Sequence, residues 1–161
     1  MFKKILVPLD GSELAAKILP HLLDLAKTQG AQVTLLFVYD AALQENTPAM
    51  IQEAFALEAK RCEAFLSQVA QDLEAQGVKA TIACVEGSPA REIIAYADQN
   101  GMDLIAMATH GKGEVAWVLG SVAEKVVSHA TVPVLLFRVL GFKPPQTKED
   151  YFLEVLERGI P

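Results

Sequence analysis

Residues 103–121 read Asp103-Leu-Ile-Ala-Met-Ala108-Thr-His-Gly111-Lys-Gly113-Glu-Val-Ala-Trp-Val-Leu-Gly120-Ser121. An apolar run is followed by a glycine-containing loop, and Ser121 then opens a segment with helical spacing. Glycines let backbone N–H groups approach an anion closely, and a helix N-terminus supplies unpaired donors with about half a positive charge. Local spacing alone fits a phosphate-binding loop and an ordinary strand-to-helix turn equally well.

Four other apolar runs along the chain resemble the one that ends at Ala108. Runs that are apolar on both faces are typical of a parallel sheet covered by helices on both sides. The segments between the runs have helical spacing, so the sequence predicts the order βαβαβαβαβ in one open α/β domain over residues 1–139. The five runs are residues 5–9, 33–38, 80–85, 104–108 and 132–139.

Local signals mark where the intervening helices are expected to begin and end. A long helix is predicted to begin at Thr47-Pro48 and to end near Gln76. The other expected starts are Asp10 with Glu13, Ser88 with Pro89 and Ser121 with Glu124, and the expected stops are Gly30, Gly77 and Gly101.

Composition excludes several classes of function. Hydrophobic residues make up 52% of the chain and charged residues 21%, which is typical of a globular domain. The net charge of −6 and the pI near 5.0 give no electrostatic footprint for DNA or RNA. The first apolar run is too short for a signal peptide or a membrane span. We therefore expect a cytoplasmic protein with no nucleic-acid or membrane partner.

The cysteines and histidines show no metal-binding spacing. Cys62 and Cys84 are expected to be thiols that pack as small core hydrophobes, in preference to a disulfide or a metal pair. His110 is expected to face solvent in its loop, with phosphate contact as the less favoured interpretation.

Two loops are candidates for a ligand site, because open parallel sheets bind ligands beyond the carboxyl ends of their strands where the strand order reverses. One follows the first strand at residues 8–12, and the other is the glycine loop after the fourth. If these strands are neighbours, Asp10 faces the glycine loop and can accept from a ribose hydroxyl or help hold a divalent cation. Alternatively, Asp10 caps the next helix through the amide of Ser12 or Glu13.

The chain resembles the universal stress protein family along residues 1–139, in the order of elements and in five short motifs. The resemblance implies a Rossmann-like, adenine nucleotide alpha hydrolase-like fold with strand order 3-2-1-4-5, and a homodimer. The motifs are Ile5-Leu-Val-Pro-Leu-Asp10-Gly-Ser12, Glu86-Gly-Ser-Pro-Ala90, Leu104-Ile-Ala-Met-Ala-Thr-His-Gly111, Leu119-Gly-Ser-Val-Ala-Glu-Lys-Val126 and Val132-Pro-Val-Leu-Leu136.

Nucleotide-binding members of this family hold ATP or AMP with a pattern of Gly, two residues, Gly, nine residues and Gly-Ser or Gly-Thr. The resemblance implies that Asp10 contacts the ribose, that Pro8 and Val38 lie beside the adenine, and that Met107 lies at the rim of the base pocket. Asp10 could also bind Mg²⁺ together with the phosphates. The candidate nucleotide-binding residues are Pro8, Asp10, Val38, Met107, Ala108, Gly111, Lys112, Gly113, Gly120, Ser121 and Val122.

Two departures from the family pattern bear on the phosphates. Ala108 replaces the first glycine, and eight residues in place of nine separate Gly111 from Gly120. Alanine is tolerated where φ is negative, which we expect because Ala108 ends a strand. The shorter loop predicts a weakened or altered grip on a triphosphate, although Gly113 adds conformational freedom. A capping box of Ser121 with Glu124 is the structural alternative to phosphate binding at the helix start.

The sequence argues against rival enzymes. No nucleophile–base pair is present, so any ATP hydrolysis is expected to be slow and incidental. A dinucleotide fingerprint from Gly111 to Ala116 lies after the wrong strand, and neither a P-loop nor a phospho-receiver pocket is complete. The remaining alternative is a nucleotide-free stress protein that acts through protein–protein contacts.

The end of the chain bears on assembly. An apolar strand over residues 132–139, with Arg138 as its only charge, predicts pairing between sheet edges in a homodimer. Residues 140–161 are expected to form a linker and a short helix outside the family resemblance. The apolar side of that helix would bury against its own domain or a partner subunit.

Overall fold

The five apolar runs form the five strands of one parallel sheet. The computed structural model describes residues 1–40, 47–110 and 119–139. Along the sheet the order is β3-β2-β1-β4-β5, which confirms the predicted topology. The strands are β1 (Lys4–Pro8), β2 (Gln32–Tyr39), β3 (Ala80–Glu86), β4 (Leu104–Ala108) and β5 (Val134–Phe137).

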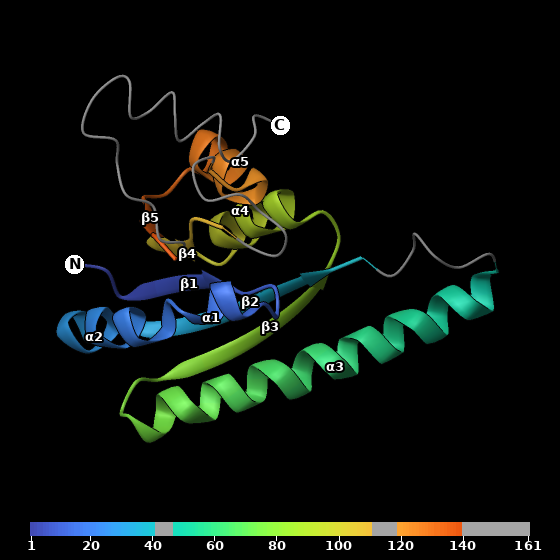
Figure 1. Cartoon of the computed structure of the whole chain (residues 1–161), viewed down its shortest axis with the longest axis horizontal. Helices are drawn as coiled ribbons and strands as arrows, with labels where there is room; N and C mark the ends of the chain where they lie inside the picture. The colour runs from blue at the N-terminus through green and yellow to red at the C-terminus, as the bar shows by residue number, and fades with distance from the viewer. Residues whose placement is uncertain (41–46, 111–118, 140–161) are drawn as a thin grey trace, which may run out of the picture.

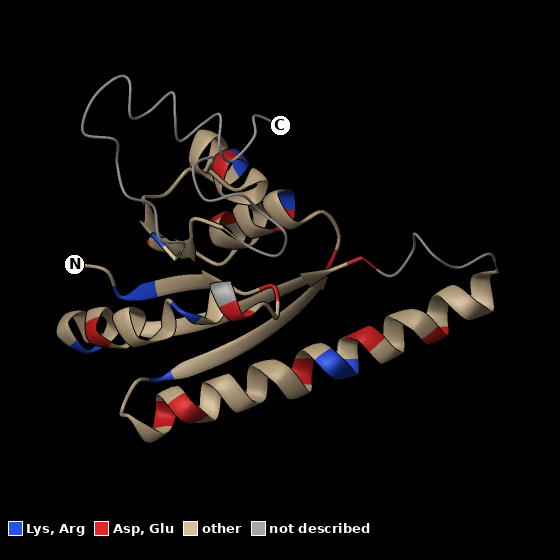
Figure 2. Cartoon of the chain, viewed as in Figure 1, with Lys and Arg blue, Asp and Glu red and all other residues tan. Residues whose placement is uncertain are grey.

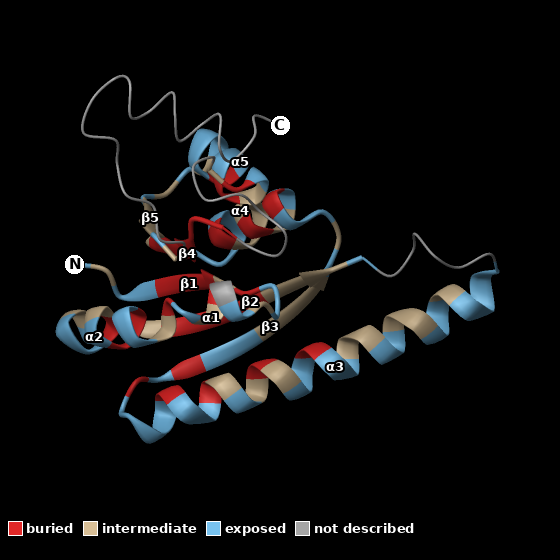
Figure 3. Ribbon diagram, in the orientation of Figure 1, coloured by how far each residue is buried: buried red, intermediate tan, exposed pale blue. Residues whose placement is uncertain are grey.

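Helices cover both faces of this sheet, as its strands require (Figure 1). The first three helices lie on one face, and the last two lie on the other. Each face has its own cluster of buried side chains, and the central strands β1 and β4 contribute to both clusters (Figure 3). The helices are α1 (Glu13–Ala16), α2 (Leu19–Gln29), α3 (Pro48–Ala75), α4 (Pro89–Gln99) and α5 (Ser121–His129).

The starts of two helices follow from side-chain caps. The Thr47 hydroxyl accepts from the Met50 amide at 3.3 Å, which confirms the predicted start of α3. At α1 the cap is Ser12, whose hydroxyl accepts from the Ala15 amide at 3.1 Å. The predicted start at Asp10 therefore lies two residues too early.

The predicted capping box at α5 is wrong. Gly120 occupies the N-cap position, and Ser121 is the first residue of the helix. Glycine has no side chain with which to cap, and the Glu124 amide donates to the Gly120 carbonyl at 2.8 Å. The capping-box pattern predicted the N-cap at Ser121, one residue later than the N-cap in the structure. The pattern could not show which backbone carbonyl accepts the first helical hydrogen bond.

Strand β5 is shorter than the apolar run that predicted it. Pro133 has no N–H for the ladder, and its carbonyl accepts from the Ile105 amide at 3.0 Å. The paired residues are therefore Val134–Phe137, and β5 forms one edge of the sheet. Residues 140–161, which contain the predicted linker and short helix, lie outside the described residues.

Charged side chains are absent from the middle of the sheet (Figure 2). They lie mainly on the helices and at strand ends, as in the ion pair of Arg61 with Glu58 at 2.9 Å on α3. Within the described part of the chain, none of the helices combines the length and apolar character needed to cross a bilayer.

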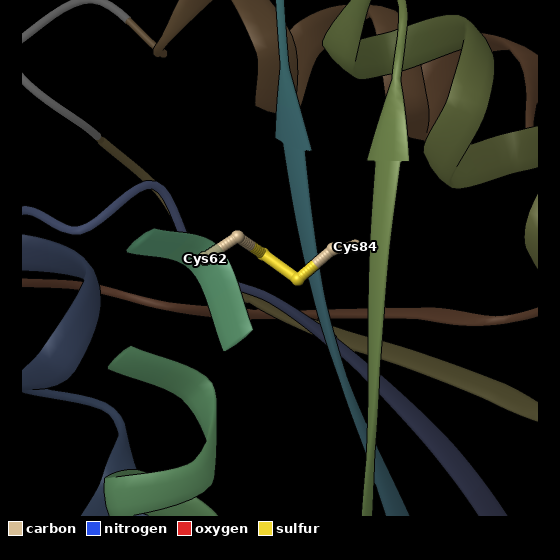
Figure 4. Close-up of a disulfide and its surroundings, with 2 residues drawn as sticks. All are labelled: Cys62 and Cys84. Carbon is tan, nitrogen blue, oxygen red and sulfur yellow. A yellow bond between two sulfur atoms is a disulfide. The ribbon is translucent and has the colours of Figure 1, made fainter. Parts of the chain in front are cut away.

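Cys62 and Cys84 form a disulfide, which corrects the expectation of two free thiols (Figure 4). Cys62 lies on α3 and Cys84 on β3, with their Cα atoms 6.1 Å apart. Both side chains face the cluster between α3 and the sheet. A spacing of 22 residues carries no signal for such a pairing, because the contact depends on how α3 packs on β3.

Reduction of this disulfide is expected to destabilise the fold. A cross-link that closes a loop of this length lowers the entropy of the unfolded chain and is worth about 3 kcal/mol. Urea unfolding with and without a dithiol should show that difference in the free energy of unfolding. Cys62→Ala/Cys84→Ala is the control and should not respond to the dithiol. Equal free energies for the oxidised and reduced native chain would contradict the prediction.

Candidate functional site

A cavity of about 310 Å³ opens beyond the carboxyl ends of β1, β2 and β4. Its volume falls in the range that small-molecule sites occupy. The starts of α1, α4 and α5 complete its walls. The lining residues are Pro8, Leu9, Asp10, Ala15, Leu36, Val38, Pro89, Ile93, Met107, Ala108, Thr109, His110, Ser121, Val122 and Ala123.

The topology explains why the cavity lies here. β1 and β4 are neighbours, with Ile5 opposite Leu104 and Leu6 opposite Ile105. After β1 the chain turns to helices on one face of the sheet, and after β4 it continues to α5 on the other face. Neighbouring strands whose connections diverge in this way leave a crevice between their carboxyl ends. The two loops predicted to compete for a ligand therefore lie at the same cavity.

One wall of the cavity is apolar. Leu36 and Val38 come from β2, Ile93 from α4 and Met107 from β4. Leu36 is fully buried and Met107 is 5% exposed, so this wall is held by the core that surrounds it. An apolar surface backed by a packed core suits a flat aromatic group.

Asp10 lines the cavity from the loop after β1, two residues beyond the end of that strand. Its Oδ1 accepts from the Ser12 amide at 2.9 Å and from the Ser12 hydroxyl. This confirms the expected contact with the Ser12 amide, and it fixes the carboxylate in a tight turn. A carboxylate at this position is an acceptor of the kind that hydroxyl donors bind.

The amino terminus of α5 forms the polar end of the cavity. Ser121, Val122 and Ala123 line the cavity and are the first three residues of the helix. The first amides of a helix have no carbonyl partner within it, and the helix dipole adds partial positive charge there. An anion is the ligand that this end of the cavity would attract.

Thr109 joins the elements around the glycine loop. Its amide donates to the Phe137 carbonyl of β5 at 2.9 Å, and its carbonyl accepts from the Gly120 amide at 2.9 Å. The second bond brings the two ends of the loop together at its base. Gly120 is buried there, although it is not among the lining residues.

His110 is 4% exposed, so the expectation that it faces solvent is wrong. Its Nδ1 lies 2.7 Å from the Thr109 hydroxyl, and the residue lines the cavity. Position in a predicted loop could not show this burial, because the surrounding elements are distant in sequence.

Ala108 has the backbone conformation that the sequence predicted. Among the described residues no residue other than glycine has a positive φ, so the extra methyl group causes no backbone strain. Ala108 ends β4 opposite Phe137 and is 7% exposed. The replacement of the first motif glycine is therefore compatible with the strand.

Not every candidate residue can be located. Pro8, Asp10, Val38, Met107, Ala108, Ser121 and Val122 all line the cavity. Gly111, Lys112 and Gly113 lie outside the described residues. The part of the chain that is described contains no group of three or more His, Cys, Asp or Glu residues suited to a metal ion.

The sequence interpretation missed part of the lining. Pro89 and Ile93 enter the cavity from α4, and Leu36 enters from β2. Ser88-Pro89 was recognised as a helix start but not as part of a site. The rule that ligands bind at the carboxyl ends of parallel strands would have included this helix start, since it follows β3 directly.

Comparisons with known proteins agree with the fold. The sequence profile of the universal stress protein family matches residues 1–138. Universal stress protein MJ0531 of Methanocaldococcus jannaschii is 35% identical over 144 residues, which cover 86% of this chain and 83% of that protein.

Solved structures show the same architecture. Protein MJ0577, also from Methanocaldococcus jannaschii, superposes with a TM-score of 0.80 at 31% identity, over 88% of this chain and 99% of that one. A universal stress protein from Archaeoglobus fulgidus in complex with dAMP has a TM-score of 0.59 at 20% identity. That match covers 84% of this chain and 97% of the other, and at this identity it speaks for the fold. The family profile and the 35% identical relative span most of the chain, which therefore belongs to the universal stress protein family.

Proposed function

We propose that this chain binds an adenine nucleotide, ATP or AMP, in the cavity and acts as a nucleotide-dependent regulator of a stress response. The observation that carries the proposal is the combination of an apolar wall, a carboxylate and a helix N-terminus around one cavity. These three features match the base, the sugar and the phosphates of a nucleotide in their chemistry. The cytoplasmic location expected from the sequence remains a prediction.

The base would lie against the apolar wall. Val38 and Leu36 present aliphatic carbons from β2, and Met107 presents a polarisable thioether from β4. Pro8 would close the wall beside them, because it ends β1 and lines the cavity. These contacts favour a flat ring but form no hydrogen bonds that would distinguish one base from another.

Asp10 would bind the sugar. The turn with Ser12 would hold its carboxylate beyond the carboxyl end of β1, where it could accept from ribose hydroxyls. The same carboxylate could help to hold Mg²⁺ beside the phosphates, which is the metal site that we expect.

The phosphates would lie at the start of α5. The amides of Ser121 and Val122 and the Ser121 hydroxyl are donors of the kind that phosphate oxygens accept. Gly111, Lys112 and Gly113 would add backbone amides and a positive charge from the glycine loop. The hydrogen bond from the Gly120 amide to the Thr109 carbonyl holds close together the two residues that flank the shortened loop.

The proposal does not depend on the dAMP complex of the Archaeoglobus fulgidus protein. That complex shows that the same fold holds an adenine nucleotide in another protein, at 20% identity. For this chain the support comes from the residues around its own cavity.

Asp10→Asn is expected to weaken binding of AMP and ATP by about tenfold, because a hydrogen bond to a neutral acceptor is worth roughly 1–2 kcal/mol less than one to a carboxylate. Asparagine can keep the turn with Ser12, so the fold should not change. Calorimetric titration in magnesium buffer measures the affinity for each nucleotide.

The matched control is Asp24→Asn, which makes the same change in charge at an exposed position on α2. Its affinity should equal that of the unsubstituted chain. Absence of heat at millimolar nucleotide for the unsubstituted chain would overturn the proposal and favour a stress protein that acts through protein contacts alone.

We also propose that the chain forms a homodimer through the edge of β5. Ile105 of β4 and Thr109, the residue after β4, donate to the carbonyls of Pro133 and Phe137. The backbone groups of Val134 and Leu136 therefore face away from β4. An edge strand with backbone groups turned outward is a template for pairing with a second copy.

Light scattering of the purified chain should give twice the chain mass of 17.4 kDa. Val134→Pro removes an outward-facing N–H without breaking a bond to β4. The dimer of this variant should therefore dissociate at higher protein concentrations than the dimer of the unsubstituted chain, with an unchanged circular dichroism spectrum. A mass of 17.4 kDa for the unsubstituted chain at every concentration would contradict the dimer.

A further inference from the structure

The disulfide between Cys62 and Cys84 joins the middle of the longest helix to an edge strand of the sheet (Figure 4). These are the only two cysteines of the chain, so oxidation and reduction interconvert two defined states without alternative pairings. Cys62 is 3% exposed, whereas Cys84 is only partly buried. Cys84 is therefore the more exposed of the two cysteines.

Cys62 is also the first buried residue along α3. Residues 48–61 are all exposed or half-buried, with Met50 46% and Leu57 50% exposed. The helix projects past the sheet in this half, and its buried positions begin at the disulfide (Figures 1 and 3). The cross-link thus fastens α3 at the point where the helix meets the core.

A short path of contacts leads from the disulfide to the cavity. Cys84 pairs with Phe37 across β3 and β2, and the ring of Phe37 packs edge-on against Phe65 of α3, with ring centroids 6.1 Å apart. A Cβ at Gly11 would lie 3.4 Å from Cε2 of Phe37, so this ring lies directly against the loop of Asp10.

Phe37 adjoins two parts of the candidate site, one along the chain and one through its ring. It lies between Leu36 and Val38 in β2, and both of these residues line the cavity. It also supports Gly11, which has a φ of 77° and follows Asp10 in the turn. Because Phe37 packs on the α3 side of the sheet and Leu36 and Val38 pack on the other side, a shift of its ring would act on the cavity through Gly11 and the Asp10 turn.

Reduction changes the spacing at the cross-link. Two bonded sulfur atoms lie ~2 Å apart, whereas non-bonded heavy atoms pack at roughly 3.5–4 Å. The two thiols must separate by rotation of their side chains or by a shift of α3 away from β3. Phe65 follows Cys62 by three residues on the same helix, so a shift of α3 carries the ring that packs on Phe37.

We propose that Cys62–Cys84 is a thiol–disulfide site that couples the redox state of the chain to its nucleotide cavity, with tighter binding in the oxidised form. This inference rests on the proposed function. The oxidised chain holds Phe37 and the Asp10 loop in one arrangement before the ligand arrives, which lowers the cost of ordering them on binding.

The reducing partner is a dithiol. One of its thiolates attacks the Sγ of Cys84 and forms a mixed disulfide, and Cys62 leaves as a thiolate. The second thiol of the reductant then displaces Cys84 and closes its own disulfide. The two cysteines gain two electrons and two protons in total, and a disulfide oxidant reverses the reaction.

The direct test compares AMP affinity in the oxidised and dithiol-reduced forms by calorimetry. We expect the reduced form to bind about tenfold more weakly. By linkage, saturating AMP should then lower the midpoint potential of the disulfide by about 30 mV. Cys62→Ser/Cys84→Ser should bind like the reduced form whether or not dithiol is present. Equal affinities in the two redox forms would overturn the inference.

Hydrogen exchange without nucleotide separates this inference from the proposed function. Reduction should speed amide exchange in residues 48–61 and in residues 10–12. Phe37→Leu should abolish the change in residues 10–12 while the change in residues 48–61 persists. If neither redox form binds AMP, the proposed function fails. Amide exchange in residues 10–12 then still tests whether the disulfide is coupled to the Asp10 loop. Unchanged exchange in residues 10–12 on reduction overturns the coupling, even in a chain that binds nucleotide.

Discussion

The pairing of β1 with β4 is the interaction on which the rest of the structure depends. Strand β4 begins about one hundred residues after β1, yet Ile5 lies opposite Leu104 and Leu6 opposite Ile105 in the centre of the sheet. This pairing reverses the strand order, sends the two following connections to opposite faces and leaves the cavity between them. It also brings Asp10 to the same cavity as the start of α5. Without it, the candidate site residues would belong to separate parts of the chain.

The cavity combines an apolar wall with polar parts. Its apolar wall comes from strands and helices that are buried in the core, as Leu36 and Met107 show. Its polar parts are a tight turn at Asp10 and the first turn of α5. The bond from the Gly120 amide to the Thr109 carbonyl ties the start of α5 to the residue that follows β4. The described residues thus offer a bound ligand an apolar surface, a carboxylate and a helix N-terminus in one cavity.

The fold could be predicted from the sequence because its signals are local. Five apolar runs of strand length, separated by segments with helical spacing, leave few architectures other than a doubly covered parallel sheet. The resemblance to the family also named seven residues that line one cavity, from Pro8 in β1 to Val122 in α5. What the sequence could not predict depends on tertiary contacts. The burial of His110 and the disulfide of Cys62 with Cys84 arise where segments far apart in sequence pack together.

We propose that an adenine nucleotide lies with its base on the apolar wall and its phosphates at α5. Titration of the ¹⁵N-labelled chain, followed through its amide resonances, tests this placement most directly. AMP should shift the amides of Val38 and Met107 together with those of Ser121, Val122 and Ala123. Adenosine, which lacks the phosphate, should shift the first group and leave the amides of α5 nearly unchanged. Shifts scattered over the surface, or none at saturating AMP, would contradict this placement.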